Sequence, residues 1–234
     1  MALIYSPGIK SGSLALIQSD EAHHLTRVLR KTAGDDIELC DGMGNLYIGR
    51  IVSTSKKRTE VQVSELLASL KQPESKLYIA IAPTKNINRF EWFLEKATET
   101  GVAGIIPMLT SHSERDKIKP ERWEKILISA MKQSKHLYKP ELLRLTDFED
   151  VLQLNHEDKF IAYSEKLPPD HLIRFADPHK ESLVLVGPEG DFSISEYEQA
   201  MHAGFHPVGL GNHRLRTETA GLAVAQIFDN KRFI

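Results

Sequence analysis

Two glycine-bearing loops near the end of the chain hold the residues whose types and spacing best suit chemistry. Residues 187–193 read Gly-Pro-Glu-Gly-Asp-Phe-Ser, and residues 210–220 read Leu-Gly-Asn-His-Arg-Leu-Arg-Thr-Glu-Thr-Ala. Glycine lets the main chain approach a ligand closely, so such loops at neighbouring strand ends form a crevice for a bound molecule. Taken singly, the first loop is also typical of a plain turn, Thr-Glu-Thr-Ala of a helix N-cap, and the two arginines of solvated charges.

The elements on either side of these loops must position them. The apolar run Ser182–Val186, closed by Gly-Pro, predicts a buried strand that ends in a turn. Ser193 and Glu196 have capping-box spacing, so a helix is predicted to begin there and to end at Gly204. A second short strand is predicted over residues 206–210, followed by a final helix that ends near residue 228.

Residues 72–234 alternate predicted strands with predicted helices, after a short polar linker at residues 72–75. An apolar stripe runs along residues 88–100, and Pro120 opens a second, longer helix. Strands separated by helices favour a parallel sheet that helices cover on both faces. The further strands are predicted at residues 76–83, 102–107, 142–145 and 159–163, and the tryptophans expected in the core are Trp92 and Trp123.

Residues 1–71 are predicted to form a small β-rich domain. Alternating apolar stretches at residues 35–40 and 46–52 flank an Asp-Gly pair, which is a hairpin signal. A helix is predicted between Asp20 and Gly34. Its apolar stripe consists of Ala22, Leu25, Val28 and Leu29.

Composition describes an ordinary globular protein, with 41% hydrophobic and 26% charged residues. The formal net charge is −2, so any RNA-binding surface must come from local basic clusters. The single cysteine, Cys40, excludes an internal disulfide framework and a cysteine-based zinc site, and it fits a reducing, cytoplasmic location. No stretch reaches the roughly 18 apolar residues of a membrane span. The histidine pair at 23 and 24 has no third ligand nearby, so no metal is expected.

The combination of strand, Gly-Pro-Glu-Gly, helix, strand, Leu-Gly, two arginines and Thr-Glu-Thr-Ala resembles the 16S rRNA (uracil-1498-N3)-methyltransferase family, the RsmE type within the SPOUT class. Glu91-Trp92 and the Lys-Ala-Thr-Glu-x-Gly-Val of residues 96–102 add to this resemblance, as does the His-His-Leu-x-x-Val-Leu-Arg of residues 23–30. The resemblance covers nearly the whole chain. It implies an α/β fold with a SPOUT-type parallel sheet and a C-terminal trefoil knot, preceded by a small PUA-like β-barrel domain.

The resemblance also implies a reaction, methylation of uracil N3 in 16S rRNA with S-adenosylmethionine as the methyl donor. Because the N3 lone pair is free only once its proton leaves, Arg216 is expected to stabilise the developing oxyanion and a glutamate to accept the proton. Glu218 and Glu189 both fit that second role, and the sequence does not choose between them. The cofactor-binding residues implied are Val186, Gly187, Pro188, Glu189, Gly190, Leu210, Gly211, Leu215, Arg216, Thr217, Thr219 and Ala220.

Basic residues outside the two loops are the candidates for binding the small ribosomal subunit RNA. A solvated helix face is the plainer explanation of such charges, and the resemblance favours RNA. Since N3 lies on the pairing edge of uracil, the base must be unpaired or flipped to react. The candidates are His23, His24, Arg27, Arg30, Lys31, Lys56, Lys57, Arg58, Lys85, Arg89 and Arg115.

Three positions depart from the family pattern. Asp191 stands where glycine is usual, His213 where arginine is usual, and Lys132 where glutamate is usual. Asp191 removes backbone freedom beside the turn, and His213 replaces a permanent cation with a titratable group. The departures put the details of substrate contact in question more than the activity.

Two other functions and a homodimer complete the expectations. A SPOUT enzyme acting on another rRNA or tRNA nucleotide, and a non-catalytic ribosome assembly factor that binds RNA, are the alternatives. The resemblance implies a homodimer with a shared active site, in which Arg115 reaches the partner's cofactor. The final helix is apolar on nearly every side, and small residues such as Gly221 would let a second helix approach. Burial within one chain explains the same pattern.

Overall fold

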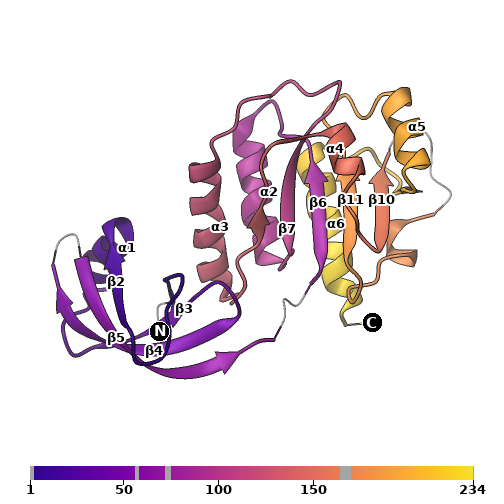
Figure 1. The fold of residues 1–234 in the computed structure, drawn as a ribbon. Coiled ribbons are helices and arrows are strands. Elements are labelled where there is room, and N and C mark those ends of the chain that lie inside the picture. The colour runs from indigo at the N-terminus through magenta and orange to yellow at the C-terminus, as the bar shows by residue number, and fades with distance from the viewer. Residues whose placement is uncertain (1–2, 56–57, 72–74, 164–169, 234) are drawn as a thin grey trace. The chain divides into compact units, whose positions relative to one another are not determined.

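The computed structural model describes residues 3–55, 58–71, 75–163 and 170–233, which divide into two compact units (Figure 1). The first unit comprises Met1–Pro73 and Met131–Lys139, and the second comprises Glu74–Ala130 and Pro140–Ile234. Lys56, Lys57 and most of the predicted linker lie outside the described residues.

The first unit is built on a five-stranded sheet. Its strands are β1 (Leu3–Tyr5), β2 (Leu14–Gln18), β3 (Asp36–Cys40), β4 (Asn45–Thr54) and β5 (Arg58–Ser69), in the order β1-β3-β4-β5-β2. The antiparallel pair β3–β4 confirms the predicted hairpin around the Asp-Gly turn. Strands β1 and β2 are the two ends of this order and do not pair among the described residues, so the expected barrel-like domain takes the form of a curled half-barrel sheet. Burial of the Cys40 thiol raises its pKa to about 12, which keeps it protonated.

The predicted helix between Asp20 and Gly34 is shorter than expected. It comprises α1 (Ser19–His23) and a π-helical turn over His24–Val28, in which the Leu29 amide donates to the His24 carbonyl at 3.0 Å. Ala22 and Leu25 are buried as predicted, whereas Val28 is 61% exposed. A π-turn takes more residues per turn than an α-turn, so it rotates Val28 away from the apolar stripe.

The second unit contains a parallel sheet, as predicted. Its strands are β6 (Leu77–Ile81), β7 (Gly104–Leu109), β8 (Glu141–Leu142), β9 (Thr146–Asp147), β10 (Asp158–Ala162), β11 (Ser182–Val186) and β12 (His206–Val208). They follow the order β12-β10-β11-β6-β7-β8, with β9 also pairing with β7. The single strand predicted at residues 142–145 is wrong in extent, because two short strands pair with successive parts of β7 there. All the registers are parallel.

Helices cover both faces of this sheet (Figure 1). They are α2 (Ile87–Glu99), α3 (Pro120–Ser134), α4 (Phe148–Leu152), the 3-10 turn η2 (Leu172–Arg174), α5 (Ile194–His202) and α6 (Thr217–Lys231). Strand β11 is buried along its whole length and alternates its side chains between the faces: Val184 packs with α2, α3 and α6, and Leu185 packs with α4 and α5. Trp123 is fully buried as predicted, but Trp92 is 42% exposed because it lies off the apolar stripe of α2.

The small residues of α6 have a neighbour within the same unit. A Cβ at Gly221 would lie 2.6 Å from Cε2 of Phe93 on α2 and 2.8 Å from Cδ1 of Ile81 on β6. Gly221 is therefore explained by intrachain packing, so it does not argue for a second helix from another chain. The trefoil knot stays a prediction, since strand order and register do not describe how the loops thread.

Candidate functional site

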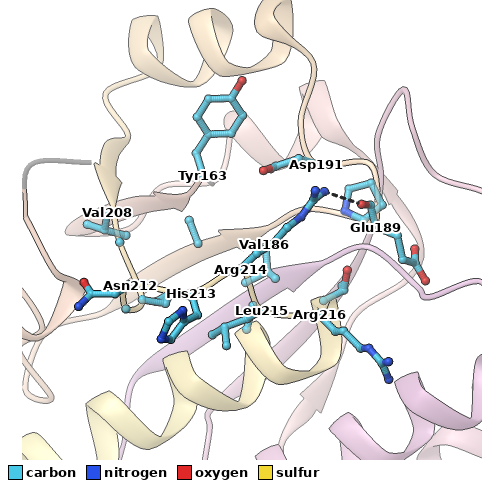
Figure 2. Close-up of a pocket in the computed structure, with 18 residues that line it drawn as sticks. Tyr163, Val186, Glu189, Asp191, Val208, Asn212, His213, Arg214, Leu215 and Arg216 are labelled. Carbon is cyan, nitrogen blue, oxygen red and sulfur yellow. Dashed lines mark hydrogen bonds between the residues drawn. The ribbon is translucent and has the colours of Figure 1, made fainter. Parts of the chain in front are cut away.

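A cavity of about 490 Å³ opens where three neighbouring parallel strands end (Figure 2). Ala162, Val186 and Val208 close β10, β11 and β12, and each contributes to its wall. Ligands of open parallel sheets bind in such crevices beyond the carboxyl ends of the strands. The complete lining is Ala162, Tyr163, Val186, Gly187, Pro188, Glu189, Asp191, Val208, Gly209, Leu210, Gly211, Asn212, His213, Arg214, Leu215, Arg216, Thr217 and Ala220.

The structure gathers nearly all of the cofactor residues named from the sequence around this one cavity. Only Gly190 and Thr219 are absent from its lining. The lining residues that sequence reasoning did not name follow from the topology. For example, Tyr163 comes directly after β10, whose place beside β11 could not be read from the sequence. Asn212, His213 and Arg214 lie within the second loop and were passed over between its glycine and Leu215.

The first loop is a tight turn from β11 into α5. The Asp191 amide donates to the Pro188 carbonyl at 2.9 Å, which closes the turn. A Cβ at Gly187 would lie 3.1 Å from the Phe192 ring, so a larger residue there would press on a buried aromatic. Asp191 has φ of +60°, the left-handed conformation that glycine adopts without strain, and its Oδ1 accepts from the Phe192 amide at 2.9 Å. A glycine, which the resemblance leads us to expect at position 191, would adopt this conformation without strain.

The helix that follows the first loop is fixed by the predicted capping box. The Ser193 side chain accepts from the Glu196 amide, and the Glu196 carboxylate accepts from the Ser193 amide at 2.8 Å. The same carboxylate accepts from the Ser111 amide at 2.7 Å and from its hydroxyl at 2.8 Å. Burial by itself would raise the pKa of Glu196, but the hydrogen bonds from Ser111 and Ser193 outweigh it and hold that pKa below its ordinary value.

The second loop contacts the first. Gly211 has φ of +144°, which other residues rarely adopt. The Arg214 Nη2 donates to the Glu189 carbonyl at 3.2 Å, as the dashed line in Figure 2 shows. The backbone of Glu189 is thereby tied to the second loop, so the two loops form one wall of the cavity.

The catalytic candidates differ in their surroundings. Glu189 is exposed at the cavity, and its Oε1 accepts from the Lys85 amide at 3.1 Å. Glu218 is only 7% exposed in the first turn of α6; its Oε1 lies 3.8 Å from Nε of Arg89, and its buried Oε2 has no hydrogen-bond partner among the described residues. Arg216 is the exposed N-cap of α6, and in Figure 2 its guanidinium points away from the other labelled side chains.

Two of the remaining basic candidates of the second unit contact their own chain. Arg115 donates from Nε to the Thr84 carbonyl at 3.1 Å and from Nη2 to the Lys85 carbonyl at 2.7 Å. The Lys85 ammonium lies 2.7 Å from the Glu114 carboxylate. Because the Lys85 amide in turn binds Glu189, Arg115 is linked through this segment to a residue of the cavity wall.

The basic candidates of the first unit are mostly open to solvent. His23, His24, Arg27 and Arg30 are all exposed, and none forms an ion pair among the described residues. Arg58 is paired with Glu60 at 2.5 Å, and the Lys31 ammonium donates to the Asp36 carbonyl at 3.3 Å.

No group of three or more histidine, cysteine or acidic residues is arranged to hold a metal ion within the described part of the chain. Likewise, no described helix has the length and apolarity to cross a membrane.

Comparison with known proteins places the chain in a family. Residues 71–229 match the model of an RNA methyltransferase domain, and residues 17–64 match that of an RNA methyltransferase PUA domain, which confirms the expected PUA-like domain. The ribosomal RNA small subunit methyltransferase E of Bacillus subtilis is 32% identical over 220 residues, which cover 88% of this chain and 86% of that protein.

Solved structures agree with this placement. A probable rRNA-methyltransferase from Porphyromonas gingivalis is 39% identical with a TM-score of 0.89, covering 100% of this chain and 99% of that one. A ribosomal RNA small subunit methyltransferase E from Neisseria gonorrhoeae, solved bound to S-adenosyl methionine, is 27% identical with a TM-score of 0.87, covering 98% and 97%. The chain therefore belongs to the ribosomal RNA small subunit methyltransferase E family.

Proposed function

We propose that this protein transfers a methyl group from S-adenosylmethionine to N3 of one uridine in the 16S rRNA of the small ribosomal subunit. The observation that carries the proposal is the cavity between the two glycine loops, in a chain of this methyltransferase family. The target nucleotide and the N3 position rest on the family resemblance. Two alternative functions are tested by the same experiment. They are methylation of another rRNA or tRNA nucleotide, and RNA binding without catalysis.

The cavity suits a donor of this size and character. Its volume of about 490 Å³ lies within the roughly 300–1,000 Å³ of small-molecule sites. Val186, Leu210 and Leu215 provide apolar walls for a base, and the main chain at Gly187 and Gly211 carries no side chain between its amides and the ligand. When bound there, S-adenosylmethionine supplies an electrophilic methyl group on a sulfonium.

Donor binding has a direct test at Gly211. Its φ of +144° strains any other residue, and no atom lies within 4 Å of the position of its Cβ, so the effect of a substitution is conformational. We expect Gly211→Val to weaken S-adenosylmethionine binding at least tenfold in calorimetry, without any divalent ion being required. Undiminished affinity, or strict dependence on a metal, would contradict the proposal that the donor binds at this site.

The chain's own residues must favour the deprotonated imide of uracil. Arg216 stabilises the oxyanion that develops at a uracil carbonyl, supported by the positive end of α6 at whose N-cap it lies. Glu189 lines the cavity, so it is our first candidate to accept the N3 proton, directly or through water. Glu218 does not line the cavity, and its place beside Arg89 suits orienting that arginine.

The proton acceptor is decided by two matched variants. Glu189→Gln and Glu218→Gln each remove one carboxylate charge and retain the side-chain shape. If Glu189 is the acceptor, its variant loses at least a hundredfold in kcat and keeps its affinity for the donor. The reverse result would give the role to Glu218.

We further propose a homodimer whose active site uses both chains. The support is the family resemblance together with the exposed Trp92 on α2, since aromatic residues are enriched at interfaces. Light scattering at micromolar concentration should show a dimer. A shared site requires Arg115 to exchange its bonds to the Thr84 and Lys85 carbonyls of its own chain for contact with the partner's cofactor. If it does so, mixing two inactive variants, Arg216→Ala and Arg115→Ala, should restore some activity through hybrid dimers. A dimer without such complementation would support the association of two chains and contradict the shared active site.

The methylation proposal is tested with labelled S-adenosylmethionine and small subunits that lack their native modification. We expect label at N3 of a single uridine, lost by at least a hundredfold with Arg216→Ala. Label on another nucleotide would give the alternative target. RNA binding with no transfer under any condition would leave the assembly-factor function.

A further inference from the structure

The loop that follows β7 contacts the cavity turn although it contributes nothing to the cavity lining. We call residues 110–115 the bracing loop. His112 lies in it, and Nδ1 of His112 is 3.1 Å from the Gly190 carbonyl oxygen and 3.0 Å from the Asp191 carbonyl oxygen. A Cβ at Gly190 would lie 3.1 Å from Cβ of His112, so the two segments pack closely.

The chemistry of the two partners fixes the tautomer of this histidine. Carbonyl oxygens only accept hydrogen bonds, so Nδ1 must carry a hydrogen and donate it to both oxygens. One N–H shared between two oxygens is a three-centre hydrogen bond. It joins two successive carbonyls of the turn, including that of Asp191, whose φ is +60°. The imidazole thus holds the turn at the residue where its backbone is under most strain.

The bracing loop is itself anchored on both sides of His112. On one side, the Ser111 amide and hydroxyl both donate to the buried Glu196 carboxylate. On the other, Arg115 donates to two carbonyls of the segment whose Lys85 amide binds Glu189. Ser111 is held by α5 and Arg115 by the segment after β6, so the loop is anchored on both flanks of His112 where it meets the turn.

From this geometry we infer that His112 is a positioning residue for methyl-donor binding, which it serves by donating Nδ1–H to the carbonyls of Gly190 and Asp191. The inference rests on the proposed function of the cavity. Gly187, Pro188, Glu189 and Asp191 all line it, so the shape of that wall depends on the turn that His112 holds. His112 touches no reacting atom, and its loss acts on donor binding and spares the transfer step.

Asparagine provides the decisive substitution. Its Nδ2 is attached to Cγ, as Nδ1 is in histidine, so His112→Asn keeps an N–H donor at the same distance from the backbone. His112→Ala removes the donor. The matched control is His179→Ala, because His179 is an exposed histidine of the same unit whose side chain makes no hydrogen bond among the described residues.

The experiment measures S-adenosylmethionine binding by calorimetry and methyl transfer to small subunits for the wild-type protein and the three variants. We expect His112→Ala to raise the Kd and the KM for the donor about three- to thirtyfold, from the loss of one shared hydrogen bond and the loosened turn. At saturating donor its kcat should stay within about twofold, and the KM for the RNA should not change. His112→Asn should recover most of the donor affinity, and His179→Ala should match the wild type.

Each other outcome points to a specific error. Wild-type donor affinity in His112→Ala would overturn the inference. Equal losses of donor affinity in His112→Asn and His112→Ala would show that packing of the ring, and not the hydrogen bond, supports donor binding. That result would also overturn the inference. A lower kcat with unchanged donor affinity would make His112 part of the chemistry. If the wild-type protein itself does not bind S-adenosylmethionine, the proposed function fails first, and that result is separate from any difference among the variants.

Discussion

At the scale of single residues, Asp191 shows how one departure from a family pattern is accommodated. Its left-handed backbone costs an ordinary residue about 1–2 kcal/mol, whereas aspartate and asparagine tolerate it because their short polar side chains bond locally. Here Oδ1 of Asp191 accepts from the next amide, that of Phe192, at 2.9 Å. The turn therefore accommodates aspartate at a position that favours glycine.

Three Asp191 variants should differ in stability in a fixed order. Asp191→Ala keeps a Cβ in the left-handed conformation and loses the local acceptor, so its free energy of unfolding should fall by about 1–2 kcal/mol. Asp191→Asn keeps the acceptor and should lie within about 0.5 kcal/mol of the wild type. Asp191→Gly should be more stable than Asp191→Ala. Urea unfolding measures all three, and an alanine variant as stable as the asparagine variant would contradict the argument.

Among elements, α5 depends on a carboxylate that serves two segments. Glu196 completes the capping box and also binds Ser111, and these hydrogen bonds set its pKa below the ordinary value. A depressed folded pKa contributes stability above the ordinary pKa of glutamate, near 4.3, and that stability is lost as the pH falls through the folded value. Glu196→Gln should therefore lower the free energy of unfolding clearly at pH 7 and much less at pH 3.

The control for Glu196 lies in the same helix. The side chain of Glu198 is exposed and makes no hydrogen bond or ion pair among the described residues, so Glu198→Gln should change stability little at either pH. Urea unfolding across this pH range is the measurement. An equal loss at pH 3 and pH 7 for Glu196→Gln would show that shape, and not charge, holds the helix.

The packing of Gly221 in the final helix, α6, can also be tested. A Cβ on Gly221 would come within 2.8 Å of two fully buried side chains, Phe93 and Ile81. Overpacking of this kind costs about 1–3 kcal/mol, which exceeds the roughly 1 kcal/mol that alanine gains over glycine in a helix. Gly221→Ala should thus destabilise the protein, whereas Thr219→Ala on an exposed face should not. A Gly221→Ala protein with a raised melting temperature would mean that Phe93 moves aside freely.

Local patterns predicted the elements well where one principle dominated. The buried run of β11 and the capping box of α5 appear in the structure with the predicted starting points, because burial and capping act over a few neighbouring residues. The π-turn after His23 was missed, since no local pattern distinguishes its hydrogen bonds from those of an α-helix. The contact between His112 and the turn was out of reach for another reason: it joins residues 78 positions apart through the order of the sheet.

At the scale of the whole molecule, the two units are proposed to divide the work. The cavity and every candidate for chemistry belong to the second unit. The first unit carries His23, His24, Arg27 and Arg30, which are exposed and lack ion pairs among the described residues. Cations that are not neutralised within the protein are the ones free to replace counterions along an RNA backbone.

This division predicts that removing two of these charges weakens RNA binding and spares the donor. For the double variant Arg27→Ala with Arg30→Ala, the slope of log K against log salt should become shallower by roughly 1.4 to 1.8, because each phosphate contact contributes about 0.7 to 0.9. Affinity for S-adenosylmethionine should stay unchanged.

Arg50→Ala is the matched control, since Arg50 is an exposed arginine of the same unit that Asp36 already neutralises at 2.9 Å. Arg50→Ala should change the slope of log K against log salt by less than about half of what one phosphate contact contributes. An equal effect of Arg50→Ala would mean that net charge alone attracts the RNA, and a parallel loss of donor affinity in the double variant would show that the two functions are not separate.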